Sequence, residues 1–233
     1  MTGHASPIDS KRKARLALAL LVPAPSLGVI AAMWIWPGPF GQAIYAFAKF
    51  WLLAFPAFWW FRVDRGRLGF SPLKRGGLGV GALTGLVVAG SVFVGYALFG
   101  KFVIDVDLMR ATAAEVGFDR KAFYLGLVTY LSFVNSLGEE YVWRWFVYRK
   151  SETLWGATAA TFLTAVFFSI HHAFALYPQF GWPLTIIGST GTFVGSLIWS
   201  WLYRRYGSLW PAYVSHAIID LSIFAVGWKV LFG

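Results

Sequence analysis

The sequence predicts an all-α membrane protein: a polytopic transmembrane helical bundle with about seven spans. Residues of the set AVILMFWYC make up 58% of the 233 residues, whereas charged residues make up only 13%. A water-soluble surface needs roughly 25% charged residues, so these charges cannot cover a globular protein in water. The apolar residues are also grouped into runs that are long enough to cross a bilayer, which needs about 20 residues per helix.

We identify seven such runs, and prolines, glycines and basic residues separate them. Trp and Tyr lie near many of their ends, as expected at the level of the lipid headgroups. The pattern is compatible with six to eight spans, because residues 101–121 are balanced in charge and are expected to form an interfacial helix. The runs are residues 16–36, 43–61, 78–100, 122–148, 153–177, 183–203 and 209–232.

Each run has its own boundary signals. The first follows a basic stretch and ends in Trp-Ile-Trp without a small-residue cleavage site, so we interpret it as an uncleaved anchor rather than a signal peptide. Pro37 and Gly38 precede the second run, and Gly76 and Gly77 precede the third. The fourth and fifth runs are divided by a short polar segment, and Pro178 is expected to end the fifth. Glycine and proline also flank the sixth and seventh runs, at positions 181, 183, 207 and 211.

The distribution of basic residues predicts the orientation. Alternate connections on one side of the expected membrane carry 13 Lys and Arg residues, and those on the other side carry 5. The excess marks the cytoplasmic side, so we expect the N-terminus inside, in a bacterial cytoplasmic membrane. The net charge of +10 is explained by these short segments, so the lipid bilayer is an expected partner and nucleic acid is not. The chain has no cysteine, which excludes disulfides, a thiol nucleophile and cysteine-bound metals.

Seven polar residues stand inside three of the last four runs. A charged side chain near the bilayer centre costs about 2.5–3.5 kcal/mol on insertion scales, so such residues are candidates for function. Since the three helices can pack together, we expect one polar site. Its members are Glu139, Glu140, Arg144, His171, His172, His216 and Asp220.

The local spacings support a single site. Glu140 and Arg144 are four residues apart, so they lie on one helical face and can pair. Glu139 points about 100° away from Glu140, so the two carboxylates need not have the same role. His216 and Asp220 are also four residues apart, and a carboxylate at that distance can fix the tautomer of an imidazole.

A glutamate and a histidine that converge on one point can activate water, and a second histidine can stabilise an oxyanion or donate a proton. These roles fit hydrolysis of an amide bond. The same side chains could instead bind a divalent metal such as zinc, with Glu139, His172 and His216 as ligands and His171 as the alternative to His172. The motifs H-E-x-x-H, G-x-S-G and G-x-G-D, which characterise other intramembrane proteases, are absent from the sequence.

Three ordered motifs resemble a known family. Residues 139–144 read E-E-x-x-x-R, residues 168–172 read F-x-x-x-H and residues 216–220 read H-x-x-x-N/D. The second motif also fits residues 167–171. This order resembles the CPBP family, the CAAX-protease and bacteriocin-processing proteins also called Abi, which include type II CAAX prenyl endopeptidases. The resemblance covers about residues 120–232.

The resemblance implies an intramembrane endopeptidase that acts near the cytoplasmic membrane face on a peptide or membrane-protein substrate. Residues 122–233 would form the catalytic bundle, and residues 1–121 would contribute three spans and a polar interfacial segment to the same membrane domain. By resemblance, Glu139 and His172 activate the water, His216 and Asp220 form an oxyanion hole, and Glu140 with Arg144 shapes the site.

Other functions remain open from the sequence alone. A non-catalytic scaffold or bacteriocin-immunity protein could retain the same polar cluster as structure. Intramembrane carboxylates and histidines also occur in proton relays, although the sequence lacks the repeats of many transporters. Paired histidines can bind haem. Lys49 lies within the second run, and we assign no role to it.

Overall fold

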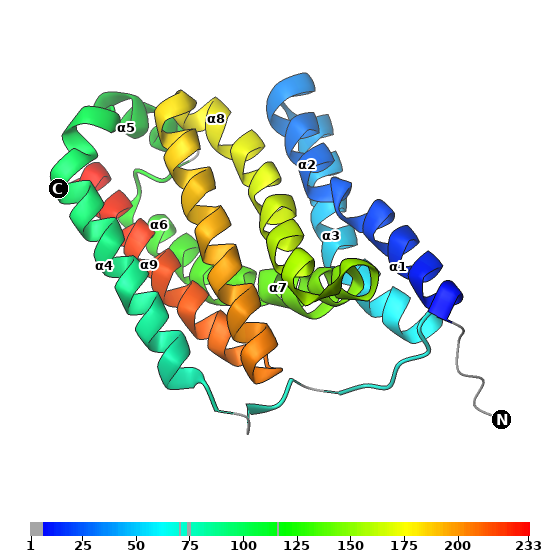
Figure 1. Ribbon diagram of the computed structural model, residues 1–233. Coiled ribbons are helices and arrows are strands. Elements are labelled where there is room, and N and C mark those ends of the chain that lie inside the picture. The colour runs from blue at the N-terminus through cyan, green and yellow to red at the C-terminus, as the bar shows by residue number, and fades with distance from the viewer. Residues whose placement is uncertain (1–6, 70, 74–75, 116) are drawn as a thin grey trace.

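A computed structural model describes residues 7–69, 71–73, 76–115 and 117–233, and within these residues the chain is helical without strands (Figure 1). Five helices in the described part are long and apolar enough to cross a membrane. The predicted all-α membrane bundle is therefore confirmed, and the protein is an integral multi-pass membrane protein. His4 lies outside the described residues.

The first spanning helix is built from three consecutive segments: α1 (Pro7–Leu21), α2 (Pro23–Ile30) and the π-helical η1 (Ala31–Ile35). It starts before the predicted first run, because the basic residues that precede that run continue the helix. It ends ahead of Pro37, as predicted. The second, α3 (Pro39–Arg62), starts at a proline, which suits a first helical position because its missing N–H has no partner there.

One helical run of 86 residues, Lys121–Tyr206, contains three of the seven predicted segments. It bends at Gly156 (φ 78°, ψ 168°) and Gly181 (φ 68°, ψ −176°), where the backbone is not helical. A positive φ is accessible to glycine at little cost, which explains why the run bends at these residues. The two bends divide the run into three legs, residues 121–155, 157–180 and 182–206. Because these three legs count as one long helix, the five long helices correspond to the seven predicted runs.

The elements of this run are α6, η3, α7 and η4, followed by the long α8, which Figure 1 shows rising to one bend and returning. We expected Pro178 to end the fifth run, and this was wrong: the helix continues through Pro178 and bends at Gly181. The bounds are α6 (Lys121–Thr129), η3 (Tyr130–Asn135), α7 (Ser136–Glu140), η4 (Tyr141–Tyr148) and α8 (Arg149–Tyr206).

The third and last spanning helices, α4 (Leu78–Val103) and α9 (Trp210–Phe232), lie side by side (Figure 1). Small residues of α4 allow the close approach: a Cβ at Gly81 would overlap the Pro211 carbonyl oxygen, and one at Gly85 would lie 3.0 Å from the Ser215 carbonyl oxygen. Small residues at a spacing of four are a common way for helices to pack in lipid.

The outer face of α4 is apolar. Leu83, Leu86 and Val94 are 61%, 61% and 58% exposed. Such exposed apolar side chains are stable where the surrounding solvent is lipid. The short α5 (Val106–Glu115) corresponds to the helix expected within residues 101–121, and its place at the membrane interface remains a prediction.

The interior of the bundle forms where α1, α3, η4, α8 and α9 meet. Large rings and branched side chains fill it, and all of them are almost completely buried, which holds the polar site rigidly. Representative members are Leu21, Phe55, Val142, Trp143, Phe146, Phe168, Trp199 and Leu202.

Candidate active site

The centre of the site is a buried charged triad that joins two helices. Glu140 and Arg144 are fully buried, and the Glu140 Oε2 to Arg144 Nε distance is 3.3 Å. The other carboxylate oxygen, Oε1, lies 2.9 Å from His216 Nδ1 on α9. Because a carboxylate only accepts hydrogen bonds, Nδ1 carries a proton. The expected Glu140–Arg144 pair is thus present, and the triad connects α7 and η4 to α9.

Aromatic rings rather than hydrogen-bond acceptors surround the rest of the Arg144 guanidinium. Its centre lies 5.2 Å from the Phe168 ring and 5.3 Å from the Trp199 ring. None of its three nitrogens makes a well-formed hydrogen bond, so the contact with Glu140 is mainly electrostatic. Trp199 also stacks on His216, with ring centroids 3.7 Å apart and planes inclined by 14°.

The second glutamate, Glu139, faces a different group of residues, as the 100° rotation predicted. Its Oε1 accepts a hydrogen bond of 2.9 Å from Asn135 Nδ2, and the Asn135 Oδ1 accepts one of 3.2 Å from Lys49 Nζ. Its Oε2 lies 3.6 Å from His216 Nε2. The Glu139 carboxylate therefore lies between the amide of Asn135, which is bound to Lys49, and the imidazole of His216 on α9.

His171 and His172 stand on the middle leg of α8, with ring centroids 4.1 Å apart. His172 Nδ1 lies 2.8 Å from the Phe168 carbonyl oxygen, which can only accept, so Nδ1 carries the proton. In the neutral ring, Nε2 then keeps its lone pair. His171 stacks on Trp143 (5.5 Å, 6°), and its Nδ1 is buried without a hydrogen-bond partner.

Asp220 completes the cluster from α9. Its Oδ2 lies 3.7 Å from His216 Nε2 and 3.0 Å from the Ser136 hydroxyl oxygen. The Asp220 side chain is 20% exposed, whereas that of His216 is 4% exposed. Both nitrogens of His216 therefore face carboxylate oxygens, one from Glu140 and two from Glu139 and Asp220.

A cavity of about 210 Å³ opens at one side of this cluster. Helices α2, α3 and α8, together with η3 and α7, line it. Glu139, His171 and His172 reach it, but Glu140 and Arg144 do not line it. Other lining residues are Pro25, Val29, Tyr45, Ala48, Lys49, Leu52, Leu131, Asn135 and Ala175.

The donor set in this cavity fits a divalent metal. Within the described chain, one possible ligand atom each from Glu139, His171 and His172 lies within 4.8 Å of the others. A carboxylate and two imidazoles suit zinc, because both groups are common ligands of this metal. The sequence suggested Glu139, His172 and His216 as ligands, with His171 as the alternative to His172. His216 Nε2 lies 3.6 Å from Glu139 Oε2, and the ligand set stays a prediction.

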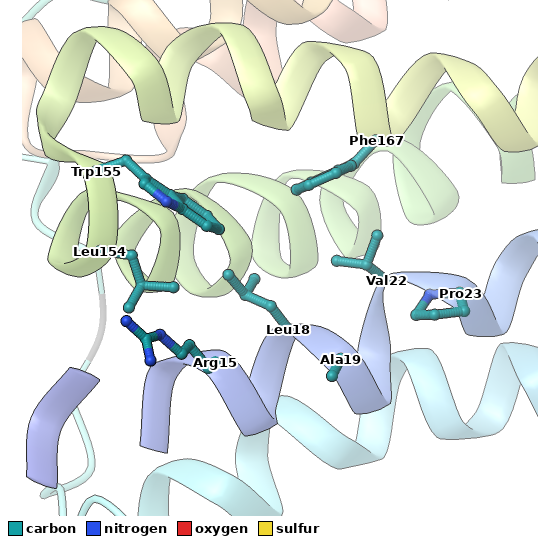
Figure 2. A pocket seen from close by; sticks show the side chains of 8 residues that line it. All are labelled: Arg15, Leu18, Ala19, Val22, Pro23, Leu154, Trp155 and Phe167. Carbon is teal, nitrogen blue, oxygen red and sulfur yellow. The ribbon is translucent and has the colours of Figure 1, made fainter. Parts of the chain in front are cut away.

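A second hollow, of about 300 Å³, lies between α1 and α8 and is almost entirely apolar. Figure 2 shows Phe167 and Trp155 of α8 facing Leu18 across it, with Arg15 at one end. Phe167 therefore points into a groove away from the polar cluster. Phe168 instead contacts the rings of His171, His172 and His216. Of the two overlapping F-x-x-x-H motifs, the one of residues 168–172 has its phenylalanine in the polar cluster, whereas the histidines of both motifs line the cavity.

The π-helical segments η3 and η4 flank the two glutamates, so that α7 is a single turn between two wider ones. Such π-turns occur frequently at functional sites because they change which side chains share a face. These π-helical segments were not predicted from the sequence, and neither were the contacts of Asn135, Ser136 and Trp199 with the site. Asn135 was detectable, because it is an amide inside an apolar run, four residues before Glu139.

One comparison with known proteins found a match. Residues 121–222 match a family model described as type II CAAX prenyl endopeptidase Rce1-like. A search of curated proteins and a search of solved structures both found no match. The matched segment contains all seven predicted polar residues. The resemblance stated from the sequence is thus confirmed at the level of the family, which is one of proteases. Residues 121–222, which are less than half of the chain, are thus similar to the Rce1-like type II CAAX prenyl endopeptidases.

Proposed function

We propose that this protein is an intramembrane endopeptidase that hydrolyses a peptide bond near the cytoplasmic membrane face. The observation that carries the proposal is the position of Glu139. Its carboxylate reaches a cavity together with two imidazoles, and its Oε2 lies 3.6 Å from a third imidazole, that of His216. One carboxylate thus lies where a water in the cavity could contact it, and it is also close to His216, which does not itself line the cavity.

In the proposed reaction, Glu139 takes a proton from a water held between its carboxylate and His172 Nε2. The tautomer of His172 suits the binding of this water. Its Nδ1–H donates to the Phe168 carbonyl, so Nε2 is free to accept a hydrogen bond from the second proton of the water. The hydroxide attacks the carbonyl carbon of the substrate. Glu139 then passes the proton to the leaving amine as the C–N bond breaks.

His216 would stabilise the oxyanion of the tetrahedral intermediate. Each of its nitrogens faces carboxylate oxygen, an arrangement that suits a doubly protonated ring whose Nε2–H can donate to a developing negative charge. Asp220 and Glu140 would orient this ring from opposite sides. Arg144 would balance the charge of Glu140 and act as a positioning residue.

A metal is compatible with the same cavity. Glu139, His171 and His172 would hold it, and it would supply a Lewis acid that lowers the pKa of bound water. The orientation follows from the basic connections: the N-terminus would be cytoplasmic, in a bacterial cytoplasmic membrane. The substrate would be a peptide or a membrane protein.

The test is cleavage of membrane-tethered peptides in liposomes by purified protein. Glu139→Gln should reduce cleavage by at least about a hundredfold, the size typical of a general base, while the protein stays folded. Glu152→Gln is the matched control, because Glu152 is an exposed glutamate. His172→Ala and His216→Ala should also lose activity.

Each variant is assayed with and without chelator. Activity that is lost with chelator and restored by zinc would support the metal-dependent form, and unchanged activity would support the metal-free form. If the folded wild type cleaves no peptide and Glu139→Gln still complements a deletion strain, the cluster is structural. The protein would then be a scaffold or an immunity protein.

A further inference from the structure

One face of the His216 imidazole lies against the indole of Trp199. The two rings are stacked, with centroids 3.7 Å apart and planes inclined by 14°, and both side chains are almost completely buried. At its edge the imidazole is held by the hydrogen bond between Nδ1 and Glu140. A single hydrogen bond lets a ring turn about its axis, whereas a flat contact with a second ring prevents this rotation. The orientation of Trp199 therefore decides where the Nε2 atom of His216 points.

A hydroxyl group anchors Trp199 in turn. The indole Nε1–H donates to Ser215 Oγ at 3.3 Å, and Ser215 is completely buried. Because Ser215 directly precedes His216 on α9, the indole contacts two consecutive residues of this helix, one through its nitrogen and one through its face. A buried indole N–H usually has such a partner, since an unpaired donor is costly away from water. The hydrogen bond to Ser215 thus sets the angle at which the indole meets His216.

The hydrogen-bonded chain continues from Ser215 to Thr84 of α4. Thr84 Oγ1 lies 3.2 Å from Ser215 Oγ and 2.9 Å from the carbonyl oxygen of Gly81. A carbonyl group only accepts, so the Thr84 proton satisfies Gly81, and the Ser215 hydroxyl can then donate to Thr84 Oγ1. Indole, serine and threonine each donate one hydrogen bond in this arrangement. Thr84 therefore fixes the direction of the Ser215 hydroxyl and leaves its lone pairs for the indole.

Thr84 reaches Ser215 because α4 and α9 approach each other closely at this level. Gly81 and Gly85 stand on either side of Thr84, and a Cβ at Gly85 would lie 3.0 Å from the Ser215 carbonyl oxygen. Small residues that let two spanning helices approach in this way also let polar side chains bond across them. Helix α4 lies outside residues 121–222, so the contact joins the N-terminal half of the chain to the site.

We propose that Thr84 is a positioning residue for His216. Through Ser215 it holds Trp199 flat on the imidazole and so directs the Nε2–H toward the oxyanion of the tetrahedral intermediate. The inference rests on the proposed function, in which His216 stabilises that oxyanion. Thr84 does not line the cavity, so its effect on the reaction is indirect. A donor stabilises the transition state only when it points at the developing charge, so rotation of His216 lowers kcat more than it affects substrate binding.

The first measurement is the NMR signal of His216, which needs no activity. The chain has four histidines, so protein labelled with ¹³Cε1-histidine gives a simple spectrum, and His216→Ala identifies the signal of His216. The ring current of a stacked indole shifts the imidazole proton upfield. Thr84→Val removes the hydroxyl group at nearly constant volume and should move the His216 signal downfield at constant pH, whereas Thr84→Ser should leave it in place. Thr84→Ala replaces Thr84→Val if the valine variant does not fold.

The second measurement is cleavage of a membrane-tethered peptide. Thr84→Val should lower kcat about two- to tenfold, the net value of one hydrogen bond, and leave KM within about twofold of wild type. Thr84→Ser should keep the wild-type kcat. In Trp199→Phe, whose ring has no N–H, Thr84→Val should have no further effect on kcat. The matched control is Ser91→Ala, which removes an exposed hydroxyl group of α4 that bonds to the Val87 carbonyl of its own helix.

The inference is overturned if folded Thr84→Val leaves the His216 signal in place, or if it changes KM and not kcat. A lower melting temperature with an unchanged signal and kcat would assign the hydroxyl group to packing alone. Equal losses of kcat in Thr84→Ser and Thr84→Val, or additive effects of Thr84→Val and Trp199→Phe, would also overturn it. If folded wild type cleaves no peptide, the proposed peptidase function fails, and the His216 signal still decides whether Thr84 positions this ring.

Discussion

The substitution Arg144→Met tests whether the buried triad is an interdependent unit. Glu140 and Arg144 are both 0% exposed, and no other described cation contacts the Glu140 carboxylate apart from His216. Removal of one partner of a buried ion pair leaves an uncompensated charge and costs about 3–5 kcal/mol. The lost contacts of the guanidinium with the Phe168 and Trp199 rings add up to about 2 kcal/mol if they are fully desolvated.

A protein of about 150–250 residues loses roughly 2–4 °C in melting temperature per kcal/mol. Arg144→Met should therefore lower the melting temperature in detergent by about 6–28 °C, as measured by tryptophan fluorescence. The double variant Glu140→Gln/Arg144→Met should recover part of this loss, because Gln leaves no buried charge and still offers an oxygen to His216. The coupling energy of the pair should exceed about 1.5 kcal/mol.

The matched control is Arg204→Met, which removes an exposed cation and should change the free energy of unfolding by less than about 0.5 kcal/mol. The reasoning is refuted if Arg144→Met shifts the melting temperature no more than this control. It is also refuted if the effects of Glu140→Gln and Arg144→Met are simply additive.

Three further predictions concern packing and the hydrogen-bond path to Glu139. Gly81→Ala should push α4 away from α9 and destabilise the folded protein by about 1–3 kcal/mol. Gly90→Ala is the control and should be neutral or slightly stabilising, because a Cβ at Gly90 meets nothing within 4 Å. Equal melting temperatures of the two variants would contradict the packing. Phe168→Ala should lower the free energy of unfolding by about 3–5 kcal/mol, because Phe168 is 1% exposed. Phe162 is 56% exposed, so Phe162→Ala should lower it by less than about 1 kcal/mol. Thermal unfolding measures both losses, and similar values would contradict the assigned burial. Asn135→Leu removes the hydrogen bonds of Asn135 to Lys49 and Glu139. It should therefore lower kcat/KM about tenfold with little change in melting temperature. An unchanged kcat/KM would exclude these hydrogen bonds from a role in the reaction.

Much of the fold follows from hydropathy alone, because apolar length decides whether a helix can span a bilayer. Every predicted run lies almost wholly within helical segments, and the exceptions are Val22, between α1 and α2, and the end residues Trp36 and Leu209. The failure at Pro178 has a physical reason: neighbouring helices and local adjustment let a membrane helix tolerate proline, whereas the positive φ of the bend favours glycine. The conformations of Gly156 and Gly181 depend on how the legs of α8 fold back, and this information is tertiary.

The site was predictable only where partners are close in sequence. The pair Glu140–Arg144 and the proximity of His216 to Asp220 follow from a spacing of four residues. The strongest contact of His216 is with Glu140, 76 residues away, and local spacing cannot predict it. For the same reason the sequence suggested no partner for Lys49, whose hydrogen bond to Asn135 joins positions 86 residues apart.

The most direct test of the central claim is hydrolysis in ¹⁸O-labelled water, with the products analysed by mass spectrometry. A peptide cleaved by wild-type protein should carry one ¹⁸O atom in the new C-terminal carboxylate, because water supplies that oxygen. Glu139→Gln, folded as well as wild type, should yield at most about one hundredth of this product. A labelled product formed at the wild-type rate by Glu139→Gln would contradict the assignment of Glu139 as the base that activates water.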